Sequence, residues 1–109
     1  EIYPMFTIEQ AQDCADIHDA VQVVVTAIEQ QIANGEAYMF IQLCERAESN
    51  DGEGYITEIK GRFYEVCVGL RIQEIGTTTL YTIIACGKDN ATHEIADLTT
   101  QCIRPVVMF

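Results

Sequence analysis

Residues 64–86, YEVCVGLRIQEIGTTTLYTIIAC, decide the fold, because apolar and polar side chains alternate on both sides of one glycine. Alternation with a period of two is typical of β-strands that bury one face. A turn at Gly76 and Thr77 aligns the apolar positions of the two arms. The aligned pairs are Val68 with Ala85, Leu70 with Ile83 and Ile72 with Tyr81. The stretch therefore predicts an antiparallel hairpin with one apolar face.

The same register places Cys67 opposite Cys86 on the other face of the hairpin. Directly opposed strand residues lie about 4.5–5.5 Å apart, near the separation that a disulfide requires. We therefore predict a Cys67–Cys86 disulfide, which contributes about 3 kcal/mol by closing this loop. The partners of Cys14, Cys44 and Cys102 stay open, with a Cys14–Cys102 pair that leaves Cys44 single as one option. Because five is an odd number, at least one thiol is unpaired or bonded to another molecule.

The segment before the hairpin has a helical period and then changes to the period of a strand. Five aliphatic residues recur at steps of three and four: Ile17, Val21, Val24, Ile28 and Ile32. They predict a helix that begins within residues 7–16 and ends at Asn34-Gly35. Residues 36–46 then alternate, with Ala37, Met39, Ile41 and Leu43 on one face. This second pattern predicts a strand.

The remaining elements complete one α+β domain over residues 1–109. A turn is predicted at 49–54, a long extended stretch at 55–74 with a bend at Gly61, and further strands at 77–86 and 93–103. The expected architecture is one long N-terminal helix packed on a four- to five-stranded antiparallel sheet. A chain of 109 residues, 49% hydrophobic, supports a single core of this kind.

Composition and cysteine use narrow the class of protein. Six basic and seventeen acidic residues give a net charge of -11, which disfavours nucleic acid and anionic membrane partners. No apolar run approaches the roughly 20 residues that a membrane-spanning helix needs, so we expect no membrane insertion.

Because the chain begins at Glu1 without an apolar leader, we expect a processed mature chain. Five cysteines without a CxxC pair favour a secreted, extracellular protein, and Asn90 heads an N-glycosylation triplet, so we predict a glycan there.

The sequence offers no catalytic or metal-binding constellation. His18 and His93 have no second His or Cys at ligand spacing, and we predict neither a metal nor a cofactor. No motif surrounds any cysteine that would make it a nucleophile, so we expect no enzyme activity. Five aromatic residues are expected in the core rather than in a ligand pocket: Tyr38, Phe40, Phe63, Tyr64 and Tyr81.

Three stretches resemble the cystatin superfamily, which includes the cathelin-like domains. They are AIEQQIANGEAYMFIQL at 27–43, Cys67-Val68-Gly69, and the closing Cys86, within a likeness that covers roughly residues 17–86. The resemblance implies a helix on an antiparallel sheet. It also raises inhibition of cysteine proteases as an alternative function. The family's inhibitory loops are lacking, since QVVVT at 22–26 has no final glycine and residues 74–78 contain neither proline nor tryptophan.

Two apolar ends, residues 1–8 and 103–109, point to contact with a partner. Extended apolar segments seek a sheet edge, either in their own chain or in a neighbouring subunit. The residues expected to mediate self-association are Ile2, Tyr3, Met5, Phe6, Val106, Val107, Met108 and Phe109. The sequence therefore predicts a secreted, non-catalytic structural or interaction module that binds protein and self-assembles through terminal β-strands into an oligomer or filament. The alternatives are the diverged protease inhibitor and a carrier of a small apolar ligand.

Overall fold

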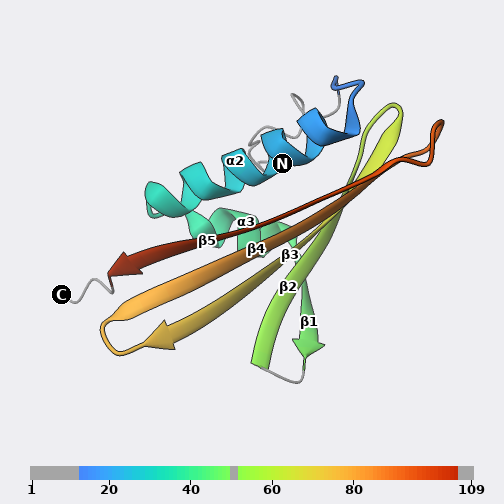
Figure 1. Ribbon diagram of the computed structural model, residues 1–109. Coiled ribbons are helices and arrows are strands. Elements are labelled where there is room, and N and C mark those ends of the chain that lie inside the picture. Colours follow the sequence, from blue (N-terminus) through green and yellow to red (C-terminus); the bar gives the residue numbers. More distant parts are fainter. Residues whose placement is uncertain (1–12, 50–51, 106–109) are drawn as a thin grey trace.

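Helix α2 (Ile17–Ala33) lies along one face of a five-stranded antiparallel sheet in the computed structural model, which describes residues 13–49 and 52–105 (Figure 1). The strands are neighbours in chain order: β1 (Glu45–Ser49), β2 (Gly52–Lys60), β3 (Tyr64–Ile75), β4 (Thr78–Asp89) and β5 (Ile95–Pro105). The predicted fold class, one long helix on an antiparallel sheet, is confirmed. The terminal residues expected to mediate self-association lie outside the described residues, while 103–105 belong to β5.

Helix α2 has the predicted apolar stripe, starts directly after the predicted stretch 7–16, and ends at Ala33, directly before the predicted stop at Asn34-Gly35. All five stripe residues are buried. Asp16 caps the helix, because its carboxylate accepts a hydrogen bond from the His18 N–H at 2.8 Å. At the other end Gly35 takes a positive φ of 76°, and the N–H groups of Gly35 and Glu36 donate to the carbonyls of Ile32 and Gln31. This bonding pattern is a Schellman motif, which turns the chain out of the helix.

The strand predicted over residues 36–46 is wrong, because this segment forms helix α3 (Ala37–Leu43). Phe40 is fully buried while its near neighbour Tyr38 is 57% exposed. A short apolar run fits both a helical and a strand period, and this one contains a single β-branched residue, Ile41. The Schellman turn brings the run back toward α2, where packing of Phe40 favours the helix.

The long extended stretch predicted over 55–74 is also wrong in one respect. It is two paired strands, β2 and β3, joined by a tight turn at 61–63, in which the Gly61 N–H donates to the Tyr64 carbonyl at 3.0 Å. The Tyr64 ring lies where a Cβ atom of residue 61 would be, so only glycine fits there. The missing side chain at Gly61 permits a hairpin, not a bend in one strand.

The β3–β4 hairpin has the predicted register throughout. Cys67 pairs with Cys86, Val68 with Ala85 and Leu70 with Ile83. The connecting turn contains Gly76 at a positive φ of 62°. The next two predicted strands also exist, with β4 and β5 extending a few residues beyond their predicted ends.

The core lies between α2 and the inner sheet face, which is the face that α2 covers. Inner-face residues of the strands are buried, and the most enclosed are Tyr64, Val66, Val68, Leu70, Ile83 and Ala85. Helix α2 packs chiefly on β4 and β5, and α3 packs beside α2. Since the helices cover one face only, the opposite face of the sheet remains uncovered by any described residue.

Candidate functional site

The outer sheet face, defined as the face turned away from α2, carries most of the exposed apolar side chains. Five of the seven exposed large hydrophobic residues among the described residues lie on it: Ile56, Ile75, Ile84, Ile95 and Ile103, each between 42% and 66% exposed. A strand face that meets only water is ordinarily polar. We therefore take the outer sheet face as the candidate functional site.

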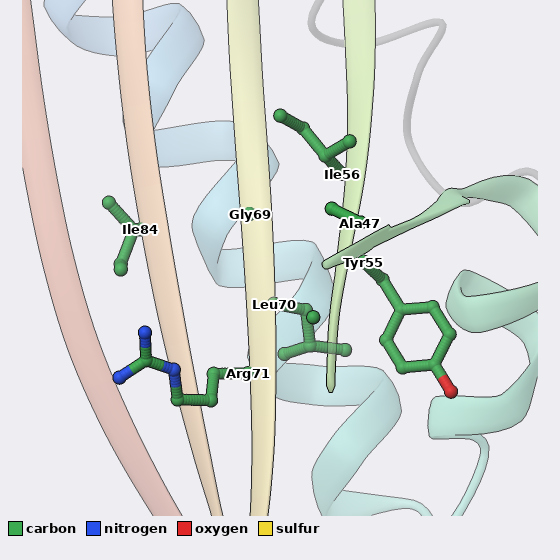
Figure 2. A pocket seen from close by; sticks show the side chains of 8 residues that line it. Ala47, Tyr55, Ile56, Gly69, Leu70, Arg71 and Ile84 are labelled. Carbon is green, nitrogen blue, oxygen red and sulfur yellow. The ribbon is translucent and has the colours of Figure 1, made fainter. Parts of the chain in front are cut away.

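Two glycines hollow the centre of this face. Gly69 on β3 pairs with Ile56 on one side and Ile84 on the other, and Gly54 pairs with Ala47 and Arg71. The absent side chains leave a trough of about 150 Å³ between the two isoleucines. Figure 2 shows Ile56, Ile84 and Arg71 on the near side of the sheet, with the helix behind it.

Gly69 is not required by packing within the chain. A Cβ atom added there would meet its nearest neighbours, the carbonyl oxygens of Ile84 and Tyr55, at 3.9 Å, which is ordinary contact. Its φ is also not in the left-handed region. Glycine weakens a strand interior, so its presence here calls for a reason outside the fold, and a close approach by another molecule is one such reason.

Cys67 and Cys86 lie on this outer face, within a row that crosses four strands. Glu58 pairs with Cys67, Cys67 with Cys86, and Cys86 with Asp97. Both cysteines are exposed, and they are not joined by a disulfide in the structure. A hydrogen bond to Asp97, burial and the nearby charges of Asp97 and Cys67 raise the pKa of Cys86. The predicted disulfide has the register that it needs and stays a prediction.

Charges are nearly balanced on the outer sheet face. Its basic residues are Lys60, Arg71 and Lys88, and its acidic residues are Glu45, Glu58, Glu65 and Asp97. Three positive and four negative charges give a net charge of -1, in a chain whose total is -11. Most of the negative charge therefore lies elsewhere on the chain.

The optional Cys14–Cys102 pair does not fit the structure. Cys14 precedes α2, whereas Cys102 pairs with Tyr81 on β4. Burial raises the pKa of Cys102, and the nearby Glu29 carboxylate raises it further, so Cys102 lies close to Glu29. Helix α2 rises about 18 Å between Ile17 and Glu29, but a disulfide needs Cα atoms within about 7 Å. The two thiols thus lie toward opposite ends of the helix. Cys44 is half-buried, and burial raises the pKa of its thiol to about 12.

Asn90, the predicted glycan site, is exposed in the turn between β4 and β5. Its backbone N–H donates to the Phe63 carbonyl at 2.8 Å, while its side chain is on the surface. The Asp89 carboxylate accepts hydrogen bonds from the N–H groups of Ala91 and Thr92 at 2.8 and 3.0 Å. The hydrogen bonds from Thr92 and Ala91 lower the pKa of Asp89. The triplet is accessible in a well-bonded turn, and glycosylation stays a prediction.

The two histidines lie at the ends of different elements and have different surroundings. His18 Nε2 lies 2.9 Å from a Glu94 carboxylate oxygen, joining the start of α2 to the start of β5. His93 has a positive φ of 66° in the β4–β5 turn. Among the described residues, no group of three or more His, Cys, Asp and Glu side chains could hold a metal ion.

The expected aromatic core forms only in part. Phe40 and Tyr64 are buried, and Tyr81 is half-buried. Tyr38 and Phe63 are exposed, and the Arg62 guanidinium lies over the Phe63 ring at 4.7 Å from its centre.

Comparison with protein-family models, with curated proteins and with solved structures found no match to this chain. The resemblance to the cystatin superfamily therefore stays a prediction. None of the helices in the described ranges combines the length and the apolar character needed to cross a bilayer.

The glycine trough was missed at the sequence level. Its signal was present, because Gly54 and Gly69 lie within or beside segments predicted as strands, where glycine often marks a close approach by another backbone or ligand. Finding it required the register of three strands, since Ile56 and Ile84 flank Gly69 only after β2 and β4 are placed beside β3.

Proposed function

We propose that this chain is a secreted, non-catalytic interaction module that binds protein and self-assembles through its sheet. The observation that carries the proposal is the outer sheet face, which exposes five isoleucines, two of which, Ile56 and Ile84, flank a glycine trough. Contiguous apolar patches on a protein surface are typical of sites of protein contact. Burial of each isoleucine in an interface contributes about 1.5–3 kcal/mol at most.

The thiol chemistry supports a non-catalytic role. A nucleophilic cysteine needs a lowered pKa, which nearby positive charge or a helix N-terminus supplies. Here the neighbouring Asp97 carboxylate and burial raise the pKa of Cys86 instead. The paired cysteines are suited to a structural disulfide in an extracellular protein.

Self-assembly through terminal strands requires an acceptor edge, and β5 offers one. This strand is the last in the sheet, so one of its two edges has no strand beside it among residues 13–49 and 52–105. An edge of this length can accept an extended segment from another subunit through backbone hydrogen bonds. The segments that we propose to exchange are residues 1–8 and 106–109, because residues 103–105 of the C-terminal apolar end already pair with β4 as part of β5.

Light scattering of the full native chain across a range of concentrations tests the proposal. We expect species larger than the monomer, and smaller assemblies after deletion of residues 1–8. A monomer at every concentration up to about 1 mM would contradict self-assembly, because an association that weak is worth only about 4 kcal/mol. Titration of papain tests the alternative, and stoichiometric inhibition would favour the protease inhibitor over the interaction module.

A further inference from the structure

We propose that the outer sheet face docks onto the outer sheet face of a second copy of this chain, about a two-fold axis that runs parallel to the strands between β3 and β4. The inference rests on the proposed function, and it names both the partner and the contact. It is separate from strand exchange at β5, because it uses side chains of the sheet face instead of backbone groups of the sheet edge.

The shape of the face is self-complementary about this axis. The rotation lays β3 of each copy over β4 of the other. Ile84 of one copy then faces Gly69 of the second copy, and the reverse contact forms at the same time. A two-fold interface is isologous, so one matched pair of features is used twice. The trough of about 150 Å³ beside Gly69 is comparable to a cavity that holds a benzene-sized group, so it has room for the end of an isoleucine side chain.

The charges nearest the axis are complementary in the same arrangement. Glu65 and Lys88 pair across β3 and β4 within one chain. The axis places Glu65 of each copy opposite Lys88 of the other, which creates two contacts between opposite charges. The outer sheet face is also nearly neutral, at -1, within a chain of -11. Two copies can therefore approach through this face with far less repulsion than through the rest of their surface.

The available area is sufficient for a specific dimer. The four long strands span about 19 Å across and about 38 Å along, which gives roughly 700 Å² for each copy. A standard protein interface buries about 800 Å² on each partner. Packed sheets keep their strands within about 30° of each other at a separation near 10 Å, which agrees with an axis parallel to the strands.

Salt should act on this dimer in two opposed ways. The same rotation brings Glu58 of each copy near Asp97 of the other, at the rim of the contact, and the two chains repel each other through their overall negative charge. Salt screens both of these repulsions, and it also screens the two attractive contacts between Glu65 and Lys88. The apolar contact of Ile84 with Gly69 does not depend on salt in this way.

Two substitutions test the contact by sedimentation equilibrium of the full chain. Gly69→Val fills the trough, and the space around Gly69 accepts a Cβ atom within its own chain. Glu65→Lys places like charges against Lys88 of the second copy. We expect each to weaken dimerisation at least tenfold, which is about 1.4 kcal/mol. Circular dichroism and thermal unfolding of each variant monitor the fold.

Two further variants separate a specific contact from a general effect of charge. Glu74→Lys makes the same change on the same strand, but Glu74 alternates with the outer-face residues Gln73 and Ile75 and so points to the other face. It should not weaken the dimer, because it only reduces the net negative charge. The double variant Glu65→Lys with Lys88→Glu should restore dimerisation, since it re-forms the opposite-charge contacts in reverse.

The outcomes distinguish this inference from the proposed function. Dimerisation that is weakened by Gly69→Val and Glu65→Lys, spared by Glu74→Lys and restored by the double variant supports face-to-face docking. Assemblies whose size is unchanged in these face variants but decreases on deletion of residues 1–8 would overturn the docking and leave strand exchange in place. A monomer under all conditions would overturn both.

Discussion

Val21 of α2 lies directly over Gly87 of β4, so that a Cβ atom added to Gly87 would lie 2.5 Å from Val21 Cγ2 and 2.6 Å from Ile17 Cδ1. This contact sets how closely the helix approaches the sheet. Close-packed interiors do not accept an extra methyl group without displacement of their neighbours.

Gly87→Ala should therefore destabilise the fold by about 1–3 kcal/mol through overpacking of the core. In a domain of this size each 1 kcal/mol lowers the melting temperature by roughly 4–8 °C. Thermal unfolding of Gly69→Ala supplies the matched control, because the same substitution on the outer sheet face meets only ordinary contacts at 3.9 Å. Equal melting temperatures for the two variants would show that α2 does not pack on Gly87 as described.

Cys67 and Cys86 should form a disulfide in the protein purified from an oxidising compartment. Peptide mapping without reduction is expected to recover the two cysteines in one linked fragment, and their replacement by serine should cost about 3 kcal/mol of stability. Cys102→Ser is the control for the loss of a thiol as such, because this half-buried cysteine lies on the inner face of β5, away from Cys67 and Cys86. Recovery of Cys67 joined to any other cysteine would refute the predicted pair.

His18 should make stability depend on pH near neutrality. The hydrogen bond to Glu94 raises the pKa of His18, so the folded state binds this proton more tightly than the unfolded state does. The stabilisation is thus fully present below the unfolded pKa of about 6.5 and is lost as pH rises through the raised pKa of the folded state. His18→Gln should reduce the melting temperature more in acidic than in alkaline buffer, and an equal reduction in both would contradict the linkage.

Asn90 should carry a glycan when the chain is secreted by a eukaryotic host. Its side chain is exposed, and neither α2 nor the sheet covers the turn that contains it. Treatment with an amidase that removes N-linked glycans should lower the mass of the wild-type chain, whereas Asn90→Gln should show the lower mass from the start. A wild-type mass equal to that of the variant would exclude the modification.

The sequence predicted the elements whose patterns are long and consistent. The register of β3 and β4 followed from alternation over more than twenty residues around Gly76, and α2 followed from a stripe of five aliphatic residues with a glycine at its end. The strand prediction for residues 36–46 was wrong because a short apolar run fits both a helical and a strand period. The position of Phe40 in the core decides between the two. The sequence predicted a bend at Gly61 instead of a hairpin turn. The need for glycine there comes from the ring of Tyr64, and no local sequence pattern contains that contact.

The candidate site was predictable only in part. Cys67 and Cys86 were placed together on the face opposite the core, because both depend on the register of one hairpin. The apolar surface around them depends on the pairing of all the strands, since Ile56, Ile84 and Ile103 come from three of them. Separation in sequence hides such a surface until the whole sheet is assembled.

The order of the strands has a consequence for how the chain folds during synthesis. Each strand pairs with the one just before it, so successive hairpins form from local contacts, which favours rapid folding. Helix α2, however, is synthesised before β4 and β5, the two strands on which it chiefly packs. Its apolar stripe therefore cannot be fully buried until both strands have been synthesised, and exposed apolar surface of this kind makes a nascent chain prone to aggregation.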